Sequence, residues 1–252
     1  MNSLPRTLKL KHLSSITLLS LLPLCGAKSA GMQEIAGFSI DRTEVSVGQF
    51  RQFVNETGFV TKAEKTGGGL VYGAGWERKA GWTWASPFGT PAKPNEPAVH
   101  VTFDEASAYC KWAGKRLPKD SEWEKAAYTE TRSEPPAPFT TGTTYDYPTG
   151  SSPLGANCLN DCGAPPAIDY SARLDRGTGH ARVGTTKAGV NGLYDMGANV
   201  WEWTENGAGT AKGTQGGSWW YGAFRMKAGD VATKPRDMAV VYIGFRCAKD
   251  IE

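Results

Sequence analysis

The sequence predicts one α+β domain that is rich in loops and has little regular secondary structure. The 252 residues include 31 glycines and 15 prolines, which favour turns, together with 9 tryptophans and 9 tyrosines, which favour a packed core. Only a few stretches show helical spacing, and the chain has neither an internal repeat nor a heptad pattern. About 220 residues after the N-terminal segment are enough for a single domain with a substantial core.

The first 29 residues have the pattern of a signal peptide. A short basic region precedes an apolar run over residues 13–24, which is too short to span a bilayer, and small residues that suit cleavage follow at Ala27 and Ser29. We therefore expect residues 30–252 to form a single exported domain, either periplasmic or secreted. A lipoprotein anchor on Cys25 is the alternative, which the bulky Leu24 before that cysteine disfavours.

The exported part carries no electrostatic sign of a nucleic-acid or membrane partner. The formal charge of the whole chain is +3, and removing the three basic residues Arg6, Lys9 and Lys11 brings it to zero. No other segment is apolar for long enough to cross a bilayer. We expect a monomer without a transmembrane segment.

Three stretches are predicted to be amphipathic helices that build the scaffold. The first begins after Ser46, which forms a capping box, and ends at Gly58; the second begins after Thr102 and ends at Gly114. A third, shorter helix covers residues 122–128. The long stretch between the first two is rich in glycine, proline and tryptophan, and its tryptophans indicate that it is ordered.

Residues 192–203 carry a candidate cation site. As a strand, this stretch would place Trp201 and Trp203 on one face and Glu202 on the other. A carboxylate between two tryptophans needs a partner, because an unpaired buried charge costs several kcal/mol. Asp195 and nearby carbonyl groups could share a calcium ion with Glu202, since calcium prefers hard oxygen ligands. A salt bridge from Glu202 to a local arginine or lysine is the alternative.

Four cysteines remain after the predicted signal peptide, at Cys110, Cys158, Cys162 and Cys247. In an oxidising compartment an even set most simply forms two disulfides, which leaves no free thiol. Three pairings are possible, and spacing alone does not choose among them. A redox-active or metal-binding C-x-x-x-C motif at Cys158 and Cys162 is the competing interpretation.

Several motifs follow one another along the chain: A-Y-C-K-W-A-G-K-R-L-P, E-W-E, G-L-Y-D-M-x-x-N-V-W-E-W, G-G-S-W and G-F-R-C. Together they resemble the formylglycine-generating enzyme, or sulfatase-modifying factor, family over nearly all of the mature chain. The resemblance implies the variant of the C-type lectin fold found in that family. It also implies that Cys110 is bonded to Cys247 and Cys158 to Cys162.

The chain departs from this family at its copper site. Formylglycine-generating enzymes oxidise a substrate cysteine with oxygen and a copper ion, which two cysteine thiolates hold just after G-G-S. The corresponding residues 219–227 include no cysteine, and Tyr221 or Met226 cannot replace a pair of thiolates as ligands of Cu(I). Copper and cysteine-to-formylglycine oxidation are therefore not expected. The iron-binding H-x-x-x-H-x-E motif of related sulfoxide synthases is also absent, and His100 is expected to be structural.

The resemblance further implies two structural calcium sites that fasten loops. The first would use side chains and carbonyl groups of Asp195, Ala198, Val200 and Glu202. Relatives often have glycine in place of Ala198, so a positive φ there would cost about 1 kcal/mol. The second site aligns less well, and its ligands would come from Asn157, Cys158, Asp169 and Ser171.

A group of aromatic and charged side chains marks a candidate pocket after the G-G-S motif, comprising Ser218, Trp219, Trp220, Tyr221, Arg225 and Arg236. Aromatic faces with one or two fixed charges suit sugars, aromatic groups or extended peptides. The alternative is that the aromatic residues pack as core and that Ser218 only forms a turn.

Two functions are compatible with these residues. One is an exported oxidative enzyme that tailors a protein or metabolite, without the copper cysteines and with no identified catalytic residue. The other is a non-catalytic, calcium-stabilised module whose aromatic and arginine pocket binds a small molecule, glycan or peptide. The missing cysteines favour the second, whereas the family resemblance favours the first. Convergence of Tyr221, Arg225 and Arg236 on one open pocket would support a ligand site.

Overall fold

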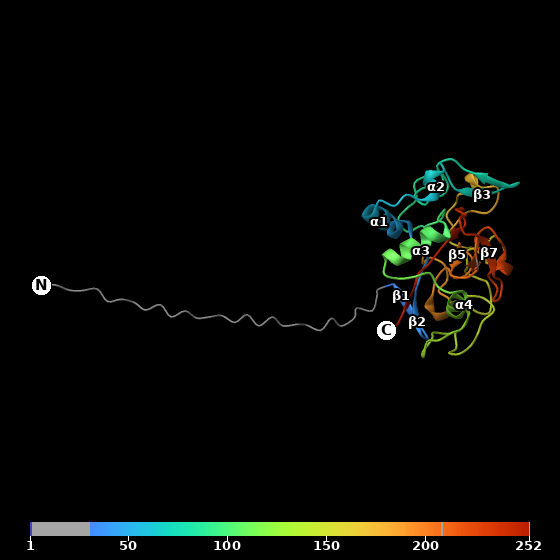
Figure 1. The fold of residues 1–252 in the computed structure, drawn as a ribbon. Helices are drawn as coiled ribbons and strands as arrows, with labels where there is room; N and C mark the ends of the chain where they lie inside the picture. The colour runs from blue at the N-terminus through green and yellow to red at the C-terminus, as the bar shows by residue number, and fades with distance from the viewer. Residues whose placement is uncertain (2–30, 208, 252) are drawn as a thin grey trace. The chain divides into compact units, whose positions relative to one another are not determined.

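The computed structural model describes residue 1 and residues 31–207 and 209–251. The predicted signal peptide, residues 1–29, lies outside this part of the chain apart from Met1. Residues from Gly31 onward form one structural unit, in which short helices alternate with three small sheets (Figure 1). In the view of Figure 1, α1, α2 and β3 lie toward the top of this unit and α4 toward the bottom.

The helices begin where capping residues place them. The α-helices are α1 (Val47–Thr57), α2 (Lys62–Lys65), α3 (Phe103–Trp112) and α4 (Asp120–Tyr128), and the short 3-10 turns are η1 (Ser171–Arg173), η2 (Val190–Gly192) and η3 (Ala223–Met226). Both predicted N-caps are confirmed, because the hydroxyl groups of Ser46 and Thr102 accept hydrogen bonds from backbone N–H groups three residues later. The third helix begins two residues earlier than predicted, at Asp120.

The strands are short and form three separate sheets. Strands β1 (Met32–Ile35), β2 (Phe38–Asp41) and β9 (Ala248–Asp250) form one sheet, and β3 (Leu70–Tyr72) and β4 (Trp76–Arg78) form a hairpin. The third sheet has the order β7-β6-β5-β8, with β7 (Ala232–Pro235), β6 (Ala211–Gln215), β5 (Trp201–Thr204) and β8 (Ile243–Gly244). Here β5 pairs antiparallel with β6 and parallel with β8, so it lies inside the sheet.

The core is dominated by aromatic side chains from the first and third helices and from β5. Phe50 of α1 stacks on Tyr109 of α3 with ring centroids 5.7 Å apart, and Phe245 packs edge-on against both rings. All four residues of β5 are buried, including Glu202. Packing on both faces of β5 therefore shields its side chains from water, and a carboxylate on this strand needs a partner within the protein.

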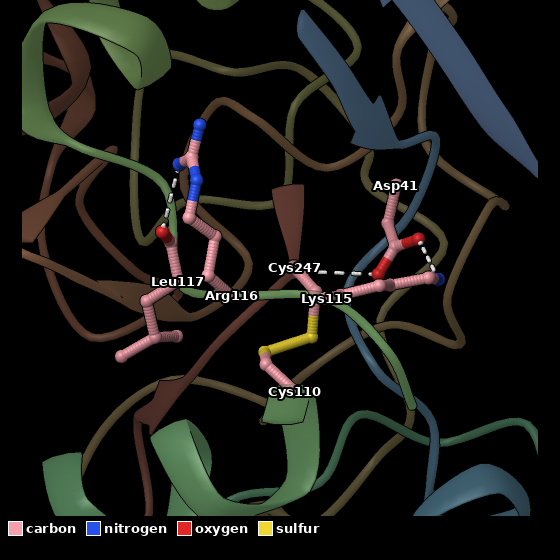
Figure 2. Close-up of a disulfide and its surroundings, with 6 residues drawn as sticks. All are labelled: Asp41, Cys110, Lys115, Arg116, Leu117 and Cys247. Carbon is pink, nitrogen blue, oxygen red and sulfur yellow. Dashed lines mark hydrogen bonds and ion pairs between the residues drawn. A yellow bond between two sulfur atoms is a disulfide. The ribbon is translucent and has the colours of Figure 1, made fainter. Parts of the chain in front are cut away.

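Both disulfides that the family resemblance implies are present. Cys110 of α3 is bonded to Cys247, which lies between β8 and β9 and 137 residues away in the sequence (Figure 2). Beside this disulfide, the Asp41 carboxylate accepts hydrogen bonds from the Cys247 backbone N–H and the Lys115 ammonium, at 3.0 and 2.6 Å (Figure 2). The second disulfide closes a short loop between Cys158 and Cys162. Together they fasten the C-terminal segment and one surface loop.

The longest described helix, α1, has 11 residues. Over the part of the chain that the structure describes, no helix is long and apolar enough to cross a membrane.

Candidate functional site

The buried carboxylate of Glu202 has an internal partner. Arg246, from the G-F-R-C motif, donates from Nε and Nη2 to the two oxygens of Glu202, both at 2.7 Å. The indole N–H of Trp123 donates to Glu202 Oε2, also at 2.7 Å. Arg246 also donates to the carbonyl oxygens of Asp41 and Tyr194, at 2.9 and 2.8 Å. The fully buried guanidinium of Arg246 is therefore the partner that the buried Glu202 carboxylate requires.

Two further buried acids surround this ion pair. The Asp195 carboxylate accepts hydrogen bonds from the Gly184 N–H and the Thr186 hydroxyl, both at 2.6 Å. Glu44 accepts from the Asn199 side chain and the Val200 N–H, at 2.7 and 3.2 Å. Burial raises the pKa of Asp195, and burial with repulsion from Asp195 and Glu202 raises the pKa of Glu44 well above its usual range.

The first predicted calcium set does not fit a calcium ion in this arrangement. Both oxygens of Glu202 already face the Arg246 guanidinium, whose positive charge would repel a divalent cation at the same carboxylate. The backbone agrees with one expectation, because Ala198 has a φ of +57°. No group of three or more His, Cys, Asp and Glu side chains in the described ranges is placed to share a metal ion.

The second predicted calcium set combines a buried side chain with an exposed one. The amide nitrogen of Asn157 donates to the Gly179 carbonyl and the Asn199 side-chain oxygen, at 3.1 and 3.0 Å. Asp169 is exposed and caps the turn at Ser171, accepting from its backbone N–H and its hydroxyl at 3.0 and 2.6 Å. A calcium ion bound to this set through carbonyl oxygens stays a prediction, which chelation of the purified protein would test.

The segment that follows G-G-S contains no thiolate and is partly core. All four cysteines of the described residues are in disulfides, so none of them offers a copper ligand. Ser218 is buried, and its hydroxyl accepts a 3.4 Å hydrogen bond from the Trp220 N–H, as in a turn. Trp219 is buried against Trp220 and Phe88. Met226, which lies in the same segment, is also buried.

An open pocket of about 610 Å³ lies where this segment meets two distant loops. One wall is formed by Trp220 and Tyr221, and another by the β3–β4 hairpin with Tyr72 and Glu77. The remaining wall comes from the loop after η1, with Asp175 and Arg176. Behind the first wall, Tyr242 stacks on Trp220 with centroids 5.9 Å apart, and burial raises the pKa of Tyr242. The aromatic wall is thus rigidly backed.

The cation of this pocket is Arg176, which sequence analysis did not identify. Its guanidinium lies 4.8 Å from the centroid of the Trp220 ring and 5.8 Å from that of Tyr221, and it donates to the Trp220 carbonyl. Two carboxylates, Glu77 and Asp175, line the same opening. Glu77 is paired with Lys79 at 2.7 Å. The pocket therefore combines aromatic faces with charges of both signs.

Arg225 and Arg236 do not converge on this pocket with Tyr221. Arg225 is paired with Asp230 at 2.7 Å and lies over the Trp201 ring, so it contacts Tyr221 from outside the pocket lining. Arg236 pairs with Asp104 at the start of α3 and lies over Phe103. Both arginines find acidic partners near by, which the aromatic pattern alone did not reveal. Of the six predicted residues, Trp220 and Tyr221 line the pocket.

Comparisons with known proteins agree with this fold. The formylglycine-generating enzyme of Thermomonospora curvata is 33% identical over 269 residues, covering 86% of this chain and 83% of that protein. The inactive C-alpha-formylglycine-generating enzyme 2 of Bos taurus is 29% identical, covering 84% and 76%. The structure of PvdO from Pseudomonas aeruginosa matches with a TM-score of 0.56 and 20% identity, covering 85% of this chain and 80% of that one.

The structural match to PvdO supports the α+β fold of the formylglycine-generating enzyme type, as predicted. Its further relation to the C-type lectin fold stays a prediction. The model of the sulfatase-modifying factor enzyme 1-like domain matches residues 26–251, nearly the whole chain. On this match, with the motifs and the similarity to the Thermomonospora enzyme, the chain belongs to the sulfatase-modifying factor enzyme 1-like family.

Proposed function

We propose that this protein is an exported, non-catalytic member of its family that binds a ligand in the pocket of Trp220 and Tyr221. The observation that carries the proposal is the composition and position of the segment after G-G-S, where the family binds copper. In this chain that segment supplies two aromatic side chains to an open pocket, while all four described cysteines are in disulfides. A thiolate copper centre has no ligands there.

The pocket suits a ligand with an apolar face and a polar edge. Tyr221 and Tyr72 offer aromatic surface, whereas Trp220 is almost fully buried beneath Arg176. Arg176, Asp175 and Glu77 offer hydrogen-bond donors and acceptors at the opening. Oligosaccharides and extended peptides share this chemistry, because both present apolar faces beside hydroxyl, amide or charged groups. Binding without covalent chemistry needs no group other than those that line the pocket.

Export is supported by the two disulfides. Stable disulfides form in oxidising compartments and are rare in the cytosol of most organisms. The Cys110–Cys247 bond joins segments 137 residues apart and lies in the core, where both cysteines are buried. A protein that depends on such a bond folds best outside the cytosol, which agrees with the predicted signal peptide at residues 1–29.

A screen with two classes of probe tests the proposal. Short peptides and oligosaccharides would be added to protein labelled at tryptophan indole nitrogens, with the Trp220 resonance as reporter. We expect one class of probe to shift this resonance. Its affinity should fall at least about tenfold in Tyr221→Ala and Arg176→Ala, because these variants lose stacking and charge–π contacts. The matched variants Phe224→Ala and Arg236→Ala, on exposed side chains outside the pocket lining, should bind as the natural protein does.

Binding that the pocket variants leave unchanged, or that the control variants weaken equally, would contradict the pocket. If the pocket variants alone weaken binding, the class of probe that binds decides between a glycan and a peptide ligand.

Oxidative tailoring remains the second candidate, favoured by the 33% identity to an enzyme named formylglycine-generating enzyme. Such an activity would need a redox metal or cofactor held by groups other than cysteine. Consumption of oxygen dependent on an added peptide or metabolite would favour this candidate over simple binding.

A further inference from the structure

We propose that Glu96 is a positioning residue that holds the pocket loop, residues 171–177, in the conformation that presents Asp175 and Arg176. The importance of this loop position for binding rests on the proposed function. The position of the loop itself can be measured without any ligand. Glu96 does not line the pocket, and no sequence motif singled it out.

One carboxylate oxygen of Glu96 contacts both ends of the pocket loop. Glu96 Oε2 accepts a 3.0 Å hydrogen bond from the Tyr170 hydroxyl, just before the loop, and lies 2.8 Å from His180 Nε2, just after it. The other oxygen accepts from the Lys93 N–H at 2.8 Å. The side chains of Glu96 and His180 are almost completely buried. A single buried acid thus links the two arms from which the loop projects.

The two arms are also paired through their backbones. The Tyr170 N–H donates to the Thr178 carbonyl at 2.7 Å, and the Ile168 N–H donates to the His180 carbonyl at 3.0 Å. These are the bonds of a narrow two-stranded stem, and the loop is its tip. Phe88 supports the stem from below, stacking on Tyr170 with centroids 3.9 Å apart and lying 5.0 Å from the His180 ring.

The tip reaches the pocket in a defined way. Arg176 donates to the Trp220 carbonyl and covers the Trp220 ring, while Asp175 lines the opening together with Glu77. Gly177, with a φ of +73°, lies so close to Trp219 that an added Cβ would come within 3.2 Å of the indole ring. Leu174 also packs against the main hydrophobic core, whereas Ser171, Ala172 and Arg173 are exposed. The stem therefore holds the two ends of the loop, and these contacts hold its tip.

The charges at the stem are consistent with a stable contact. Burial lowers the pKa of His180, so the ring is neutral near pH 7. His180 Nδ1 is buried with no hydrogen-bond partner, which assigns the ring proton to Nε2, facing Glu96. Burial alone would raise the pKa of Glu96, but bonds from His180, Lys93 and Tyr170 outweigh it and keep the carboxylate ionised. Both donors therefore face an anion, which strengthens each bond.

Hydrogen exchange of backbone amides tests the proposal in the full mature chain. We expect Glu96→Ala to speed exchange of the hydrogen-bonded amides of Tyr170, Arg173 and Leu174 at least about tenfold relative to the rest of the protein, because bonds to a charged acceptor are lost. Glu96→Gln keeps one oxygen as acceptor and should restore much of this protection, with a change of about threefold. Glu130→Gln is the matched control, since Glu130 is equally buried and contacts Arg132 and Asn191 instead.

Local exchange that rises no more in Glu96→Ala than in Glu130→Gln would overturn the assignment. Should Glu96→Ala fail to fold, Tyr170→Phe removes only the hydroxyl and should still speed exchange of the Arg173 and Leu174 amides more than elsewhere. If the loop opens as expected but no probe shifts Trp220 in the natural protein, Glu96 keeps its positioning role and the binding function fails.

Discussion

Arg246 and Arg176 each lie beside acidic and aromatic residues, yet the two regions differ in what they leave unsatisfied. Arg246 is fully buried, donates to both oxygens of Glu202 and also bonds two carbonyl groups. Arg176 is exposed at the edge of a pocket, where Asp175 and Glu77 also face the opening. The first region has used its polar groups to build the fold. The second retains polar groups that a ligand can meet, which makes it the better binding site.

The largest effect should come from the disulfide next to Arg246. In the chain-entropy model, the stabilisation grows with the length of the closed loop. The separations of 137 and 4 residues correspond to about 5 and about 2 kcal/mol. We expect the double change Cys110→Ala and Cys247→Ala to cost far more unfolding free energy than Cys158→Ala with Cys162→Ala, in chemical denaturation. Equal losses would show that loop closure does not set the difference.

Breaking the buried ion pair should cost nearly as much. Arg246→Met leaves Glu202 buried beside Trp123 with its positive partner gone, a change that typically costs about 3–5 kcal/mol. Denaturant midpoints with an unchanged slope would measure it. Adding Glu202→Leu to the variant should recover part of the loss, because the unpaired carboxylate is then removed. A small loss in Arg246→Met alone would mean that another group compensates Glu202.

The acids around Arg246 should make stability fall as pH rises through the weakly acidic range. The pKa of Glu44 is raised by burial, and that of Asp195 is raised as well. The folded state therefore keeps these protons to higher pH than the unfolded chain, and stability is lost above the unfolded pKa of each acid. Glu44→Gln should remove part of this slope. Urea unfolding at pH 4.5 and 7 would measure it, and an identical pH dependence in the variant would refute the assignment.

The smallest effect is expected at the protein surface. Arg236 pairs with Asp104, and both side chains are about half exposed. Exposed ion pairs contribute little because water and salt screen them. Arg236→Met should leave the unfolding free energy nearly unchanged. A loss similar to that of Arg246→Met would remove the distinction between the two regions.

The scaffold could be predicted because its signals are local. Ser46 and Thr102 begin helices through capping boxes, and the need of Glu202 for a partner follows from its two tryptophan neighbours. The identity of that partner was left open, since a calcium ion and an arginine satisfy the same carboxylate. Arg246 could have been suspected from the G-F-R-C motif only by knowing that β8 lies beside β5.

The pocket was harder to predict because long-range contacts build it. Trp220 and Tyr221 were identified from their aromatic cluster, but Arg176 lies in a glycine-rich loop without a recognisable motif. Glu96 reaches this loop across 74 and 84 residues of sequence. Arg225 and Arg236 were among the candidates, but each has an acidic partner that satisfies it. The sequence therefore predicted that the pocket contains aromatic and arginine side chains, but the tertiary structure determines which of these residues line it.

Elemental analysis of the mature protein, purified after export and without chelators, tests the central claim most directly. The claim is that this chain keeps the family's fold but replaces the copper centre with a binding pocket. It predicts no stoichiometric copper, since the described cysteines are all in disulfides. It also predicts no stoichiometric iron, since no three His, Cys, Asp or Glu side chains among the described residues are grouped to bind a metal. One copper or iron per chain would contradict it, and the oxidative function would then become the better account.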